Sequence, residues 1–481
     1  MKRTLSSESL QEVNTRLEHA HKALQKRYPG PSGERQPVHV VYGGAHLFRS
    51  GITRRLGEIA LRSLDEFAPD FAAFAKAVSL AGAESLPEAH DAAASLAKSV
   101  DADPQAARRE NYPAWFSCTV YRRVREKLQR EPVEDYRIDF EDGYGNRPDE
   151  EEDGHAAAAA NELSVGLNAG ELPPFIGIRI KPFTEELRER SMRTLDIFLT
   201  ELAAKTRGEL PKNFFITLPK IALPDEVACL ADICSRLEPM LDLEPGRLRI
   251  ELMIETPQAV LNERGEANLL SLVGAARGRC AAVHFGPYDY TASIGIAALH
   301  QAMTHPASDF ARQMMQVALA GTGIRTSDGP VNILPIPPYR TPKEGAPLTP
   351  SQMQSNRATM HAAWKLHFDV VRRALANGYY QGWDLHPAQL PSRYAAIYSF
   401  FLENLDSASQ RLRNFIEKAA QATRVGHVFD DAAMAQGLLN YFLQAINCGA
   451  LTTGEVESLT GLSQAELRSA SFVQILARRT Q

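Results

Sequence analysis

Four β-rich stretches in the middle of the chain decide its fold: YRIDFEDG (136–143), FIGIRIKPF (175–183), FFITLPKI (214–221) and LRIELMIET (248–256). Each is rich in branched and aromatic side chains, and a longer segment with helical spacing of its apolar residues separates it from the next. Strands that alternate with helices form βαβ units, and such units build a parallel sheet. This part of the chain therefore predicts an α/β fold.

Further strand-like runs continue this alternation on both sides. Eight strand–helix units predict a (β/α)₈ TIM barrel, whereas an open doubly wound sheet needs fewer strands and usually begins with a Gly-rich turn. The chain has no G-x-G-x-x-G or Walker A sequence that would favour the open sheet. The added runs are VHVVYGG (38–44), AAVHFGPYDY (281–290), PVNILPI (330–336) and YYQGWDLHP (379–387).

The chain is longer than such a barrel requires. We expect an N-terminal helical segment over 1–36, the barrel over 37–395 and a C-terminal helical domain over 396–481, helical to its end. Within the barrel we expect a helical insertion at about 52–130 after the first strand, and a Pro-rich loop at about 335–350. The extra helices are expected to cover the mouth of the barrel.

Composition limits the class of protein. Hydrophobic residues make up 44% of the 481 residues and charged residues 23%, which excludes wholesale disorder. The net charge of −5 shows no basic excess for binding nucleic acid or an anionic membrane. Five scattered cysteines favour free thiols in a reducing compartment, and neither a signal peptide nor a membrane span is evident. We therefore predict a cytoplasmic protein.

The alternation of side chains along each strand predicts which of them face the barrel interior. So many charged groups inside a barrel require ion-pair partners or a metal, because burying an uncompensated charge costs several kcal/mol. Glu251 lies deepest, and for it a structural ion pair at the barrel floor is an equally good interpretation. The residues expected to face inward are Arg137, Asp139, Glu141, Gly177, Arg179, Glu251, Met253, Glu255, His284, Gly286, Asp384 and His386.

Several of these residues lie at the carboxyl ends of strands, where barrel active sites are found. Glu255 ends the fifth strand and Asp289 follows the sixth, and two carboxylates from adjacent strands suit Mg²⁺ or Mn²⁺. Glu141 and Asp142 could hold metal-bound waters or orient the substrate. Arg179 would provide a forked donor for a carboxylate or for a developing enolate oxygen.

The segments DFEDG, IRI, LPKI, IETPQAV, FGPYDYTASIG and WDLHPAQ follow one another over roughly 135–390. This ordered series resembles the superfamily of the citrate lyase β-subunit, malyl-CoA lyase and the class II 2-oxo acid aldolases, which have phosphoenolpyruvate/pyruvate-type barrels. The resemblance implies Glu255 and Asp289 as ligands of Mg²⁺ (or Mn²⁺), Arg179 as the binder of the oxo acid and its enolate, and Glu141 and Asp142 as site carboxylates.

The aldolase branch of this superfamily also implies an acid/base histidine on the first barrel loop. His46 is the candidate here, although it could equally be an ordinary histidine at a Gly-Gly turn. Substrate-binding positions are expected, besides Arg179, at Gly286, Pro287, Asp384 and His386 near the ends of strands six and eight. Lys220 is expected to point outward by alternation, and the sequence leaves the orientation of Asp328 open. Lys181 and Gly143 depart from the superfamily's usual residues and, with the insertions, indicate a divergent long branch.

Three functions follow as hypotheses. The first is a Mg²⁺-dependent carbon–carbon lyase or aldolase that acts on a hydroxy acid or 2-oxo acid through a metal- and Arg-stabilised enolate. The second is a CoA-thioester condensing enzyme or thioesterase on the same barrel, with Arg49, Arg54 and Arg55 as candidates for binding the CoA phosphates. The third is a catalytically silent barrel that acts as a binding protein. The resemblance also implies a homo-oligomer, either a trimer or a hexamer.

Overall fold

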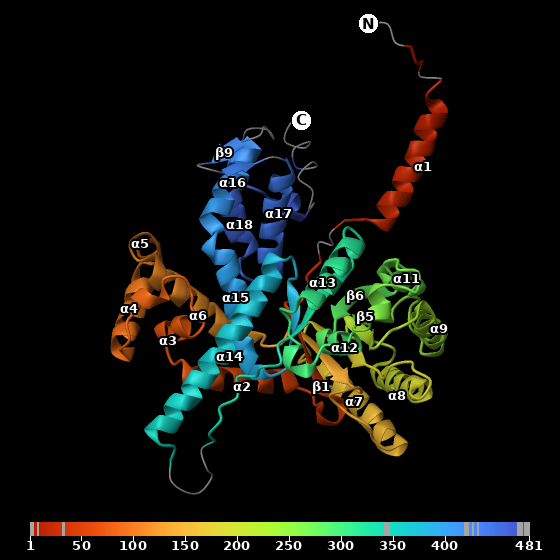
Figure 1. Cartoon of the computed structure of the whole chain (residues 1–481), viewed down its shortest axis with the longest axis horizontal. Helices are drawn as coiled ribbons and strands as arrows, with labels where there is room; N and C mark the ends of the chain where they lie inside the picture. Colours follow the sequence, from red (N-terminus) through yellow and green to blue (C-terminus); the bar gives the residue numbers. More distant parts are fainter. Residues whose placement is uncertain are drawn as a thin grey trace.

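The computed structural model describes residues 4–6, 9–30, 34–340, 347–417, 423–425, 428–430, 432–468 and 475. Eight parallel strands form a closed barrel in the order β1 to β8, which confirms the predicted α/β TIM-type fold (Figure 1). The strands are β1 His39–Gly44, β2 Asp135–Asp139, β3 Phe175–Arg179, β4 Phe214–Leu218, β5 Arg249–Ile254, β6 Cys280–Phe285, β7 Arg325–Pro330 and β8 Gln381–Asp384.

Helices surround the barrel, and a group of them separates β1 from β2. The helices between β1 and β2 are η1 Ala45–Leu47, α2 Ile52–Phe67, α3 Phe71–Ala77, η2 Ala83–Ser85, α4 His90–Ala102, α5 Pro104–Glu110 and α6 Tyr112–Arg130. The later ones are α7 Asp149–Ala169, α8 Arg188–Thr206, α9 Pro224–Met240, α10 Pro257–Val260, α11 Leu269–Ala275, α12 Pro287–Ser293, η3 Ala298–His300, α13 Pro306–Leu319, α14 Pro350–Ala376, η4 Pro387–Gln389 and α15 Leu390–Glu403.

The seventh strand differs from the prediction. It spans Arg325–Pro330, whereas the apolar run 330–336 follows it with no regular structure beyond Pro330 itself. Proline cannot donate a ladder hydrogen bond, and this run contains Pro330 and Pro335. The real strand has the polar sequence RTSDGP, in which Ser327 and Asp328 are buried. Of the expected Pro-rich loop, residues 341–346 lie outside the described residues.

The C-terminal part contains α16 Leu405–Glu417, α17 Ala432–Asn447, α18 Thr453–Thr460 and α19 Gln464–Arg468. An antiparallel pair, β9 Thr423–Val425 and β10 Val428–Asp430, interrupts the helices, so the expectation of helix to the end is wrong here. Residues of α17 share a cavity with Arg249 and Arg325, the first residues of β5 and β7. This helix therefore covers the amino-terminal end of the barrel, not its mouth as expected.

At the other end of the chain, helix α1 (Gln11–Arg27) stands apart from the barrel in Figure 1, and none of its residues is buried. No helix among the described residues is long and apolar enough to cross a membrane.

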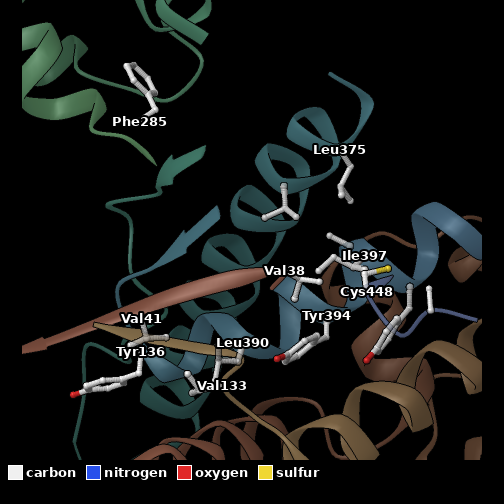
Figure 2. Close-up of a cluster of buried hydrophobic side chains, with 14 of the residues drawn as sticks. Val38, Val41, Val133, Tyr136, Phe285, Leu375, Leu390, Tyr394, Ile397 and Cys448 are labelled. Carbon is white, nitrogen blue, oxygen red and sulfur yellow. The ribbon is translucent and has the colours of Figure 1, made fainter. Parts of the chain in front are cut away.

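The apolar core lies between the outer surface of the barrel and the helices around it. Figure 2 shows a part of this core in which Val41 and Tyr136, from β1 and β2, lie near Leu390 and Tyr394 of α15. Tyr394 is fully buried, and its hydroxyl donates to the carbonyl of Pro132 at 3.0 Å. This packing holds the first two strands against the helix that follows the last strand, and the pairing of β1 with β8 closes the barrel.

The barrel interior is polar but internally paired. Arg137 bonds both Asp135 and Glu251, with 3.0 Å to the latter, and its Nε donates to the Thr217 hydroxyl at 3.0 Å. Thr217 in turn donates to Glu251 at 2.7 Å, and all four side chains are essentially inaccessible to solvent. Glu251 thus belongs to an ion-pair layer beneath the mouth, which supports its structural interpretation.

Two buried histidines should make the stability of the fold pH-dependent. Burial lowers the pKa of His39 and of His284 to about 4 each, from an ordinary value of 6.5. Below pH 6.5 the unfolded chain takes up protons that the folded chain does not, so the free energy of unfolding falls by about 1.4 kcal/mol per histidine per pH unit until pH reaches about 4. Urea titrations between pH 8 and 4 should show this loss.

A variant pair tests the cause. His284→Gln should make the loss between pH 6.5 and 4 shallower, whereas His19→Gln, on the exposed helix α1, should leave it unchanged. An identical pH profile in the wild type and His284→Gln would show that this imidazole does not contribute.

Candidate functional site

Four carboxylates contact one lysine at the mouth of the barrel, three through its ammonium group and one through its main-chain N–H. The Nζ of Lys220 bonds Glu141, lies 3.2 Å from Asp142 Oδ1 and is 3.8 Å from Asp289 Oδ1. The main-chain N–H of the same residue donates to Glu255 Oε1 at 2.6 Å. Lys220 therefore contacts both predicted metal ligands, Glu255 and Asp289, as well as the pair that follows β2.

The backbone turns Lys220 into this position. Ile216 and Leu218 of β4 are buried in the outer core, and strict alternation would place Lys220 on the same side. The residue instead has φ +50°, a left-handed conformation that is uncommon outside glycine and breaks the alternation. The predicted outward orientation is wrong for this reason. Asp328, which the sequence left open, faces outward and pairs with Arg312 of α13 at 2.8 Å.

Arg179 is held rigidly at the edge of the mouth. Its Nε and one Nη donate to the two oxygens of Asp139 at 2.7 and 2.6 Å, the forked geometry that guanidinium and carboxylate groups favour. Its other Nη lies 3.0 Å from Glu141 Oε2. The guanidinium carbon lies 4.8 Å from the ring centre of Tyr42 and 5.5 Å from that of Trp383. One Nη thus remains directed toward the mouth.

Burial and mutual repulsion perturb the pKa values of the carboxylates at the mouth. Burial, together with the charge of Asp289, raises the pKa of Glu255 to about 8 despite the nearby Lys220. Burial also raises the pKa of Glu141. The pKa of Asp142 is lowered, because the charges of Lys220 and Arg179 outweigh its partial burial. The cluster therefore holds more negative charge than its own cations compensate.

This imbalance fits a divalent cation. Arg179 and Lys220 are the two cations in contact with these groups, and they face five carboxylates: Asp139, Glu141, Asp142, Glu255 and Asp289. Oxygen donors are the ligands of Mg²⁺ and Mn²⁺, and Mg²⁺ commonly takes one or two protein carboxylates and fills its remaining positions with water and substrate. No group of three or more His, Cys, Asp and Glu side chains arranged to hold a metal occurs in the described part of the chain. Glu255 and Asp289 fit the smaller, open type of site.

His46 lies on the loop after β1, in the short helix η1. Its ring packs 5.6 Å from that of Tyr144 and 6.1 Å from that of His155, between centres, and its buried Nδ1 has no hydrogen-bond partner in the described chain. Partial burial and the charge of Arg147 lower its pKa, so the ring is a neutral base at pH 7. These contacts place His46 beside the β2–α7 loop.

The predicted substrate-binding positions separate into two groups. Gly286 directly follows β6 and lies against Glu255, and the buried Pro287 opens α12, the helix that carries Asp289. His386 directly precedes η4, where its Nδ1 accepts from the N–H of Ala388 at 3.1 Å. These three positions are all at the carboxyl end of the barrel.

The predicted orientation of strand eight is wrong. Trp383 is in register with Val40, and its indole lies 4.3 Å from the ring of Tyr42 and 5.4 Å from that of His284 inside the barrel, so the next residue, Asp384, points outward. There Asp384 is fully buried, accepts from Arg393 at 2.8 Å and lies 3.0 Å from His367 Nε2. Helices α14 and α15 supply these partners, so Asp384 anchors the outer helices to the barrel and does not reach the mouth.

An aromatic layer that was not expected from the sequence lies beneath Arg179. The rings of Tyr42 and Trp383 lie 4.3 Å apart, and His284 lies 5.4 Å from Trp383, between ring centres. The Tyr42 hydroxyl is 3.1 Å from His284 Nδ1. The alternation of side chains along β1 could have predicted that Tyr42 faces the barrel interior. Trp383 was expected to face the outer helices, because its side chain is apolar.

The fold and the site define a closed parallel barrel with an acidic mouth. The chain belongs to the family described as "Domain of unknown function (DUF6986)", whose model matches residues 17–475. No curated protein matches the chain.

Solved structures of similar fold include a citrate lyase from Burkholderia xenovorans LB400, at 19% identity over 70% of this chain and 92% of that one, with a TM-score of 0.51. The CitE protein of Mycobacterium tuberculosis, in complex with magnesium, acetoacetate and coenzyme A, has 15% identity over 69% and 95%, with a TM-score of 0.42. A malate synthase of Haloferax volcanii, in a lead(II) complex, has 14% identity over 72% and 89%, with a TM-score of 0.39. The first likeness shows the common barrel fold.

Gly286 should be essential to the position of Glu255. A Cβ atom at residue 286 would lie 2.5 Å from Glu255 Oε2 and 2.6 Å from its Cβ, closer than side chains tolerate. Gly286→Ala should therefore displace Glu255, lower the free energy of unfolding by about 1–3 kcal/mol and weaken Mn²⁺ binding. Chemical unfolding and titration calorimetry with Mn²⁺ measure the two effects.

Gly274→Ala is the matched control, since a Cβ in this part of α11 meets no atom within 4 Å. It should bind Mn²⁺ like the wild type and should be at least as stable. Unchanged Mn²⁺ binding in Gly286→Ala would contradict the role of this glycine.

Proposed function

We propose that this chain is a Mg²⁺-dependent carbon–carbon lyase or aldolase that acts on a hydroxy acid or 2-oxo acid through an enolate. The observation that carries the proposal is the gathering of Glu141, Asp142, Glu255 and Asp289 around Lys220, in excess of the charge that Lys220 and Arg179 supply. A protein that only needed a stable barrel would lose free energy by keeping this excess charge. That cost also argues against a catalytically silent binding protein.

Glu255 and Asp289 are the proposed metal ligands. A bound divalent cation supplies Lewis-acid charge that stabilises negative oxygens of the substrate. Glu255 is nearly inaccessible to solvent, whereas the Asp289 side chain is 41% exposed. Glu255 would therefore hold the ion from the barrel side, and Asp289 would hold it at the exposed side of the mouth.

Arg179 is the proposed binder of the oxo-acid oxygen that becomes the enolate. Two of its donors are held by Asp139, and the remaining Nη now donates toward Glu141. A substrate oxygen in the place of the Glu141 carboxylate would receive this N–H without any movement of the guanidinium. Glu141 and Asp142, which also bond Lys220, would orient the water or the substrate.

His46 is the proposed acid/base, since its Nδ1 has no hydrogen-bond partner in the described chain and its imidazole is neutral at pH 7. It would take a proton from the substrate hydroxyl during cleavage and return it to the enolate carbon. Gly286, Pro287 and His386 would line the bound acid.

The contacts of the arginines after the first strand give less support to the alternative of a CoA-thioester enzyme. Arg49 donates to the carbonyl of Phe48, and Arg54 lies 3.8 Å from Glu171. Arg49 and Arg54 thus have partners within the protein and Arg55 is exposed, so this loop gives the alternative little support. A homo-oligomer, trimeric or hexameric, remains part of the proposal.

Removal of either metal ligand should abolish the activity. The activity can be followed as the exchange of the methyl protons of pyruvate for deuterium in D₂O, because this exchange requires the enolate. Wild-type protein with Mg²⁺ should catalyse this exchange, and proton NMR measures its rate. Glu255→Gln and Asp289→Asn should each eliminate the exchange and lower the Mn²⁺ affinity at least about 100-fold. This loss is larger than the loss caused by removing a residue that only hydrogen-bonds a metal ligand.

Asp225→Asn, an exposed carboxylate at the start of α9, is the control and should retain both properties. Full exchange by Glu255→Gln after removal of divalent cations would overturn the proposed function.

Arg179→Lys tests the enolate donor. Lysine keeps the charge but cannot bond Asp139 with two donors and present a third to the mouth. The exchange rate should fall about 100- to 1,000-fold, as for the loss of one oxyanion donor, while Mn²⁺ affinity stays close to that of the wild type. A wild-type exchange rate in this variant would rule out Arg179 as the enolate donor.

A further inference from the structure

A second polar cavity lies at the amino-terminal end of the barrel, opposite the mouth. Its volume is about 330 Å³, which is sufficient for a small organic anion. Arg249 and Arg325, the first residues of β5 and β7, line it from the barrel side. The amide side chains of Asn440, Gln444 and Asn447 from helix α17 line it from the other side.

The two arginines lack partners of their own. Neither guanidinium has a hydrogen bond or an ion pair within the described part of the chain. Arg325 lies over the rings of Phe175 and Phe215, 4.9 Å from each centre, and Arg249 lies 5.5 Å from that of Phe215. These apolar rings hold the flat faces of the guanidinium groups, so their N–H edges are left for other acceptors.

The acidic groups near this cavity are already committed. Asp135 and Glu251 attract Arg325, but Asp135 Oδ1 and Glu251 Oε2 each bond Arg137 in the layer above. On the cavity wall, Arg35 lies 3.1 Å from Glu134 and also pairs with Glu131, and Glu34 lies on the same stretch of chain. Burial and the charges of Arg137 and Arg249 lower the pKa of Arg325. The described lining of the cavity thus carries Arg35, Arg249 and Arg325, the last two partly buried, against the one carboxylate of Glu34.

Three separate parts of the chain close the cavity. The segment after α1 is bound to the barrel by the N–H of Gly30, which donates to Gly321 at 2.9 Å, and by Gln36, which donates to the carbonyl of Thr326 at 3.2 Å. Helix α17 contributes the third wall. The cavity is therefore formed only when both terminal regions are docked on the barrel.

We propose that this cavity binds a small oxyanion, with carboxylate or phosphate oxygens held by Arg249 and Arg325 and the remainder hydrogen-bonded by the amides of α17. Guanidinium groups match carboxylate and phosphate oxygens in geometry and charge. The site is separate from the acidic mouth and does not depend on the proposed lyase activity. A bound anion would connect the barrel to the two terminal regions and stabilise all three together.

Titration calorimetry with inorganic phosphate and with citrate tests the proposal and distinguishes the two oxyanion chemistries. The full chain is first dialysed free of divalent cations, so that an anion cannot bind at the mouth through a metal. At least one of the two anions should bind, with an affinity that falls as the salt concentration rises, and should raise the unfolding temperature. Arg249→Gln and Arg325→Gln should each weaken binding at least about tenfold.

Two further variants keep the test decisive if the arginine variants fold poorly. Gln444→Ala changes only the α17 wall and should weaken binding of the same anion severalfold. Arg247→Gln is the control, since this arginine donates to the carbonyls of Leu210 and Pro211, outside the cavity, and its loss should leave the affinity unchanged.

The proposal is overturned if neither anion binds at millimolar concentration, or if Arg247→Gln weakens binding as much as Arg325→Gln does. Equal affinity of Gln444→Ala and the wild type would likewise remove α17 from the site.

Discussion

Burial of charge inside the closed barrel is the constraint on which the rest of this structure depends. Arg137 with Glu251, and Arg179 with Asp139, lie almost entirely out of water. Such ions persist only where partners of opposite charge satisfy them, because the loss of hydration costs several kcal/mol per ion. The pairs form successive layers along the barrel axis, and the upper layer holds Arg179 rigidly below the mouth. A preorganised donor of this kind needs no rearrangement when negative charge develops on a substrate.

The two ends of the barrel carry opposite excesses of charge. At the mouth the carboxylates outnumber Lys220 and Arg179, and at the amino-terminal end the arginines that line the cavity outnumber its carboxylate, Glu34. Two ends of different charge are possible because the strands are parallel, and every strand contributes its first residues to one end and its last residues to the other. The cation proposed for the mouth and the anion proposed for the opposite cavity would each compensate a local imbalance.

Backbone geometry decides how the mouth is assembled. The left-handed conformation of Lys220 presents its main-chain N–H to Glu255 and its ammonium to the carboxylates after β2. Gly286 leaves the space that the Glu255 side chain occupies. A strained backbone conformation persists only where the surrounding contacts hold it in place, and such conformations concentrate at functional sites. Both support a functional interpretation of the acidic cluster.

The sequence by itself determined the βα alternation, and hence the barrel, because the apolar periodicity of each strand and helix is a local property. It also determined that Glu141, Glu255 and Asp289 come at or just after the ends of strands. Tertiary structure alone decided the rest. The orientation of Trp383 and Asp384 depends on the register of their strand with β1. The inward turn of Lys220 depends on one positive φ angle, and the position of helix α17 depends on contacts that are distant in sequence. Register, left-handed backbone and long-range packing leave little trace in local periodicity, because each is set by neighbours that only the folded chain brings together.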